Sequence, residues 1–118
     1  MIAEILIAGI LCFTQPADVQ PGLEYVGTYT VSAYSYEEGG GENYYTASGM
    51  TPVPWYTVAT TSEFEFGTVL YIEDLGEVMV MDRGGFPSDW IDLHVGHTDP
   101  NDFDMRERKV YIVTGGEK

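Results

Sequence analysis

The sequence has few cysteines and few basic residues. Cys12 is the only cysteine among 118 residues, which excludes an internal disulfide and a zinc site built from cysteines. Five Lys and Arg stand against nineteen Asp and Glu, giving a formal net charge of −14. Nucleic-acid binding depends on neutralising phosphates with Lys and Arg, so we expect no DNA or RNA partner. A neutral or weakly charged partner is favoured.

The sequence also lacks an apolar run long enough to span a bilayer comfortably. The nearly apolar stretch Ile5 to Phe13 is too short for that. It is similar to the apolar core of a secretory signal, although Glu4 occupies a position where a positive charge is expected. Two alternatives remain for residues 1–14: a signal or anchor segment, or a simple apolar strand or helix. The two prolines and the glycine of residues 15–24 predict a linker.

The composition favours β structure, with nine Tyr, five Phe and two Trp beside frequent Val and Thr. Alternation and turn residues predict short strands at residues 25–33, 56–59, 69–72, 77–81, 89–95 and 108–114. Residues 35–45 predict a flexible acidic loop, and residues 97–105 a short helix with Thr98 as its N-cap. We therefore expect a mainly β domain over residues 25–118, a small six-stranded closed barrel with one short helix.

Two aspartates interrupt strand-like sequence. Asp82 ends an apolar run and precedes the Gly84-Gly85 turn. Asp92 lies inside an apolar strand, so alternation turns it away from the core. In a groove beside an aromatic ring its pKa would rise, as a general acid requires. The alternative is that Asp82 only caps the turn and Asp92 is solvated on an edge strand.

Other polar clusters give weaker signals. His94 and His97 could join Asp92 or Asp99 at a metal, but a metal site usually needs three or four convergent ligands. The acidic run of residues 99–104 lacks the glycine of a calcium loop. We predict no metal and no cofactor.

Aromatic residues flank the segment TASGMTPVP. They are Tyr44, Tyr45, Trp55 and Tyr56, and the segment contributes the hydroxyls of Thr46 and Ser48. Aromatic rings suit the apolar faces of sugars, and hydroxyls bond to sugar hydroxyls. For Trp55 and Tyr56, packing within the barrel is an equally good explanation.

These segments together resemble a known family. The order YTASGMTPVP, FGTVLYIED, VMVMDRGG, WIDLHVG and VYIVT is similar to the bacterial 3D (three-aspartate) domain, over about residues 27–114. That family is a double-psi β-barrel related to the barrel of membrane-bound lytic transglycosylase A. The form DRGG also resembles rare-lipoprotein-A-like domains.

The resemblance implies a lytic transglycosylase that cuts the β-1,4 bond between N-acetylmuramic acid and N-acetylglucosamine in peptidoglycan. It implies Asp92 as catalytic acid/base and Asp82 as its support. The third family aspartate falls at Thr60, where this sequence departs from the pattern. The predicted substrate-binding residues are Tyr45, Thr46, Ser48, Gly49, Thr60, Gly84, Gly85 and His94.

The resemblance implies that the protein acts in the cell envelope or the extracellular space, or on a phage particle. Membrane contact is expected only through an N-terminal anchor. Two other functions remain open. One is a glycan-binding or wall-loosening barrel that cleaves no bond, which the missing aspartate at Thr60 favours. The other is an interaction module on an envelope or phage particle, in which Asp82 and Asp92 only brace the barrel.

Overall fold

The computed structural model describes residues 22–114. The expected signal or anchor over residues 1–14, and the linker as far as residue 21, lie outside the described residues. The first strand begins at Leu23, so it includes the last two residues of the expected linker. Within residues 22–114 no helix is long and apolar enough to cross a membrane.

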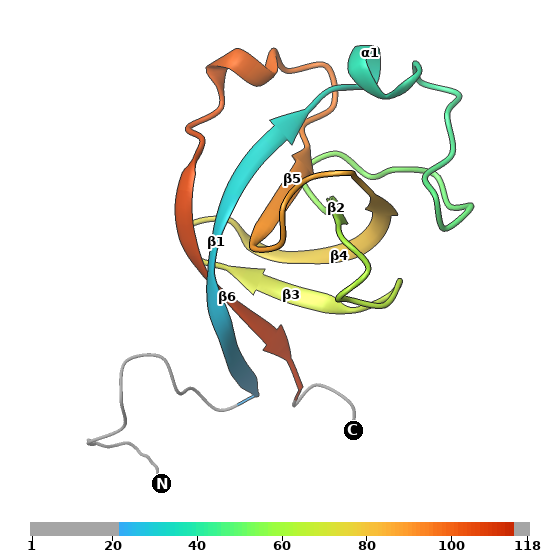
Figure 1. Cartoon of the computed structure of the whole chain (residues 1–118). Coiled ribbons are helices and arrows are strands. Elements are labelled where there is room, and N and C mark those ends of the chain that lie inside the picture. The colour runs from blue at the N-terminus through green and yellow to red at the C-terminus, as the bar shows by residue number, and fades with distance from the viewer. Residues whose placement is uncertain (1–21, 115–118) are drawn as a thin grey trace, which may run out of the picture.

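Six strands close into a mixed barrel with the order β1-β5-β2-β4-β3-β6 (Figure 1). Two neighbouring pairs, β1–β5 and β2–β4, are parallel, and the other four are antiparallel. The expected mainly β, six-stranded barrel is therefore confirmed. The strands are β1 (Leu23–Tyr34), β2 (Thr57–Thr60), β3 (Val69–Ile72), β4 (Gly76–Arg83), β5 (Trp90–His94) and β6 (Arg106–Val113).

Alternating apolar side chains fill the barrel interior. β4 contributes Val78 and Val80, and β5 contributes Ile91 and Leu93, all between 0% and 1% exposed. Strand alternation places every second residue on the inner face, so the residues between them are left for the outer face. The predicted orientation of Asp92, opposite to Ile91 and Leu93, follows from this packing.

The helical segments differ from the prediction. The short helix expected over residues 97–105 is present as a single 3-10 turn, η1 (Pro100–Asp102), but the predicted cap is wrong: the side chain of Asp99, not Thr98, caps it. Pro100 supplies the fixed φ that suits a first helical position. The expected flexible loop contains a short helix, α1 (Tyr36–Gly39), because the Ser35 side chain accepts a hydrogen bond from the Glu38 N–H.

A β-bulge in β4 decides which way Asp82 points. Val58 lies opposite Val80, but the next residue, Ala59, lies opposite Asp82, so Met81 is an extra residue on β4. An unbroken register would turn Asp82 to the inner face with Val80, since side chains alternate along a strand. The bulge brings Asp82 to the outer face instead.

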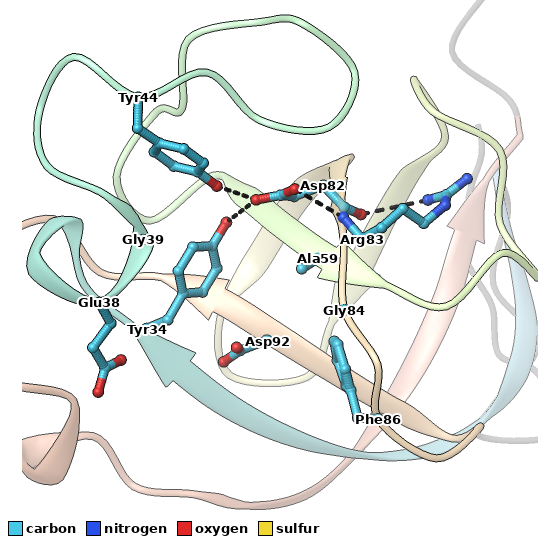
Figure 2. A pocket seen from close by; sticks show the side chains of 10 residues that line it. All are labelled: Tyr34, Glu38, Gly39, Tyr44, Ala59, Asp82, Arg83, Gly84, Phe86 and Asp92. Atoms are coloured by element: carbon cyan, nitrogen blue, oxygen red, sulfur yellow. Dashed lines mark hydrogen bonds between the residues drawn. The ribbon is translucent and has the colours of Figure 1, made fainter.

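The central strand β2 lies between the two aspartates. Ala59 is opposite Asp82 of β4 on one side and opposite Asp92 of β5 on the other. Two strand spacings put their backbones roughly 10 Å apart. The small Ala59 side chain leaves room between the two carboxylates. Glu38 and Gly39 of α1 lie near these residues (Figure 2).

Candidate functional site

A cleft of about 430 Å³ opens over Ala59. Its lining combines three carboxylates, three aromatic rings, one guanidinium group and small residues (Figure 2): Tyr34, Glu38, Gly39, Tyr44, Ala59, Asp82, Arg83, Gly84, Phe86 and Asp92. Concave sites with apolar walls and a few convergent polar groups are the usual form of a ligand site. The cleft therefore brings together Asp82, Asp92 and Gly84 of the residues expected from the sequence.

Asp82 accepts hydrogen bonds at both carboxylate oxygens. The hydroxyls of Tyr34, at 3.1 Å, and of Tyr44 both donate to Oδ2 (Figure 2). The backbone N–H groups of Ala47 and Arg83 each donate to Oδ1 at 2.9 Å. Four donors converge on a side chain that is 9% exposed. Asp82 is thus the fixed carboxylate of the cleft, with its orientation set from β1, β4 and the segment between α1 and β2.

The turn over residues 46–50 holds the Ala47 N–H in place. Thr46 donates its hydroxyl to the Met50 carbonyl at 2.8 Å, and the Gly49 N–H bonds the Thr46 carbonyl. Gly49 has φ of 89°, which glycine adopts without strain. The Ser48 N–H joins this turn to the bulge residue Met81. The expected residues Thr46, Ser48 and Gly49 therefore shape the support of Asp82 and do not line the cleft.

Asp92 has a looser environment. Its Oδ1 accepts a hydrogen bond from Ser32 at 2.9 Å, and the Trp90 indole N–H donates to the Ser32 oxygen at 2.8 Å. Among the described residues no donor reaches Oδ2. Burial raises the pKa of Asp92 to about 6; the Ser32 hydrogen bond opposes this, and the charges of Glu38 and Asp82 add to it. A carboxyl group with this pKa can give up and take back a proton near neutral pH.

The two tyrosines at Asp82 are held as proton donors. Burial, followed by the hydrogen bond to Asp82, raises the pKa of Tyr44 to about 12. Burial also raises the pKa of Tyr34 well above its usual range. Both phenols therefore stay protonated around neutral pH and keep donating to the carboxylate.

Gly84 permits one wall of the cleft to form. A Cβ at this position would overlap the Phe86 ring, so only glycine lets that ring lie against the chain. The ring also makes an edge-to-face contact with Trp90, at 6.4 Å between centroids. Gly85 has open space around it, and nothing in the structure assigns it a comparable role.

Three further expected binding residues, Thr60, His94 and Tyr45, do not line this cleft. Thr60 is 1% exposed and donates its hydroxyl to the Thr61 carbonyl, while its neighbour Ala59 lines the cleft. His94 is fully buried behind the cleft, with its ring edge-to-face against Tyr34. Burial lowers the pKa of His94, so it is a neutral packing residue. Tyr45 lines a separate hollow.

Several residues of this site were not predicted from the sequence: Ser32, Tyr34, Glu38 and Phe86. Ser32 and Tyr34 could have been found from strand period, because both lie on the outer face of β1, and Ser32 lies opposite Asp92. Nothing in the sequence predicts that the Ala47 N–H donates a hydrogen bond to Asp82, 35 residues further along the chain.

His97 ties α1 to the following loop. Its Nδ1 lies 2.7 Å from Glu37, and its Nε2 contacts Glu42. These hydrogen bonds, first that of Glu37, raise the pKa of His97. The Tyr36 ring packs against it at 4.8 Å. This exposed cluster steadies the segment that carries Glu38 and Tyr44 to the cleft.

The described part of the chain contains no group of three or more His, Cys, Asp or Glu side chains that could hold a metal ion. No protein-family model matches the sequence, and no curated protein matches it. The chemistry of the cleft is therefore the basis for a functional assignment, together with the resemblance in the sequence.

Proposed function

We propose that this protein is a peptidoglycan lytic transglycosylase with Asp92 as its general acid/base. The observation that carries the proposal is the state of Asp92: a carboxyl group with a pKa raised to about 6, anchored at Oδ1 and free at Oδ2, in an aromatic-lined cleft. Aromatic walls suit sugar rings. The net charge of −14 is compatible with a glycan ligand, because binding sugar rings does not require Lys or Arg side chains.

The proposed reaction needs only one proton carrier. Protonated Asp92 gives its proton to the glycosidic oxygen as the bond to C1 breaks and positive charge develops at C1. The resulting carboxylate then removes the proton from the C6 hydroxyl, whose oxygen bonds to C1. The products are a 1,6-anhydro-N-acetylmuramic acid end and a free 4-hydroxyl, and no water is consumed. Asp82 supplies a fixed negative charge that stabilises the oxocarbenium-like centre.

The experiment incubates the purified protein with peptidoglycan sacculi and searches for anhydro-muropeptides by mass spectrometry. We expect them with the native chain and with Asp89→Asn, an equivalent change at an exposed aspartate outside the cleft. With Asp92→Asn we expect their rate of formation to fall by about 10²-fold or more. Products with a reducing end would contradict the mechanism, because a hydrolase adds water.

A second candidate is a glycan-binding or wall-loosening barrel without bond cleavage. The observation that favours it is the absence of a carboxylate on β2, where Ala59 lines the cleft and Thr60 occupies the position of the third family aspartate. Binding to sacculi with no soluble products from the native chain would support this candidate and exclude the first.

A further inference from the structure

A second hollow lies beside the cleft. It measures about 370 Å³ and is lined by Glu42, Asn43, Tyr44, Tyr45 and Thr51. Both hollows fall in the range of roughly 300–1,000 Å³ that is usual for small-molecule sites. Tyr44 lines both of them, so they are neighbours that share one wall.

The lining of the second hollow suits a neutral, hydroxyl-rich ligand. Asn43 offers an amide donor and acceptor, and Thr51 offers a hydroxyl. Tyr45 is 68% exposed and presents its ring to solvent, where a sugar face can stack on it. No Lys or Arg belongs to the lining, so an anionic group has no counter-charge there.

The walls of this hollow are anchored before any ligand arrives. The Tyr44 hydroxyl donates to Asp82, which fixes the shared wall. The turn over residues 46–50 does not line the hollow but connects its lining residues Tyr45 and Thr51, and it is fastened to β4 by a hydrogen bond of 3.1 Å from the Ser48 N–H to the Met81 carbonyl. A preorganised site binds more tightly than one that must order on binding.

We propose that the second hollow is a subsite for a further sugar of the same glycan strand. An N-acetylglucosamine ring, the uncharged sugar of the strand, stacks on Tyr45 and bonds to Asn43 and Thr51, and Tyr44 separates it from the sugars in the cleft. The inference rests on the proposed function, because the strand enters this hollow from the cleft. It adds a direction to that function: the strand runs from Asp92 past Tyr44 toward Thr51.

The test uses the full chain carrying Asp92→Asn, so that binding is measured without cleavage. The probes are a disaccharide and a tetrasaccharide of alternating N-acetylglucosamine and N-acetylmuramic acid, titrated by calorimetry. We expect Tyr45→Ala to weaken tetrasaccharide binding about fivefold and to leave disaccharide binding unchanged. Asn43→Ala should act in the same direction. Tyr71→Ala, at an exposed tyrosine on β3 outside both hollows, is the matched control.

The outcomes separate this inference from the proposed function. Unchanged tetrasaccharide affinity in both variants overturns the subsite, as does an equal loss for both probes, which would make Tyr45 part of the cleft. If the native chain still yields anhydro-muropeptides in those cases, only the subsite fails. The native chain could also form no anhydro-muropeptides while Tyr45→Ala weakens binding of the tetrasaccharide only. The subsite would then be supported, but as part of a glycan-binding barrel that cleaves no bond.

Discussion

The two sides of the cleft hold the same chemical group in opposite ways. On the β4 side, Asp82 accepts four hydrogen bonds and is 9% exposed. On the β5 side, Asp92 accepts one, from Ser32, and burial raises its pKa to about 6. Hydrogen bonds favour a carboxylate, whereas burial without them favours the protonated acid. This difference supports the proposal that Asp82 acts as a fixed charge and Asp92 as a proton carrier.

Removing the proton carrier should have the largest effect. We expect Asp92→Asn to lower the rate of peptidoglycan solubilisation by about 10²- to 10⁴-fold, the usual contribution of a general acid/base. The same variant should keep its thermal stability at pH 7. The folded-state pKa of Asp92 is raised from 3.8 to about 6, so the native chain loses stability as pH rises through that window. Asparagine cannot ionise, so the variant does not lose this stability. A lower melting temperature than that of the native chain at pH 7 would contradict the difference between the environments of Asp82 and Asp92.

Removing the fixed charge should affect folding most. Asparagine at position 82 has one acceptor oxygen for four donors, and two of these donors are backbone N–H groups that cannot rotate away. We expect Asp82→Asn to lower the free energy of unfolding by about 2 kcal/mol, measured in urea at pH 7. Equal stability of Asp82→Asn and Asp92→Asn would remove the distinction between the two sides.

Single donors to Asp82 can be removed without changing its charge. Tyr34→Phe and Tyr44→Phe each delete one hydroxyl, and each should cost about 1 kcal/mol of unfolding free energy. We expect the larger loss at Tyr34, which is buried, because water replaces the Tyr44 hydroxyl more easily. Thermal denaturation of the pair checks the order. The reverse order would mean that Tyr44 is the main support of Asp82.

The smallest expected effect is a shift in pH dependence. Ser32 stabilises the charged form of Asp92, so Ser32→Ala should raise the pKa of Asp92 further, by about half a unit. Activity needs the protonated acid and should fall as pH rises past about 6 in the native chain. In the variant this fall should move to higher pH. A curve that keeps its midpoint and only loses height would mean that Ser32 does not tune Asp92.

Much of the fold could be predicted from local sequence patterns. The hairpin formed by β3 and β4 and the outward orientation of Asp92 follow from turn residues and alternation. The short helix predicted over residues 97–105 forms as a single 3-10 turn, but its cap was predicted one residue too early, because Pro100 begins the turn and the Asp99 side chain caps it. The loop prediction failed at α1, because one cap from Ser35 suffices for one helical turn.

The candidate site could be predicted from the sequence only in part. Asp82 and Asp92 were singled out, but alternation alone would place Asp82 on the inner face with Val80. The expectation that Thr60 contacts substrate came from counting along the chain, and Ala59 lines the cleft at that level of β2. The orientation of Asp82 was not predictable for another reason: the extra residue Met81 is defined only relative to the neighbouring strand β2.

The sequence by itself determined the barrel strands and their apolar faces, because burial of every second side chain is a local, periodic property. It also determined the direction of Asp92. Only the tertiary structure decided that Met81 forms a bulge and turns Asp82 outward. It likewise decided that Tyr34, Tyr44 and Ala47 meet at Asp82. These contacts join residues 35 to 48 positions apart, and such pairings depend on strand order and register around the closed barrel.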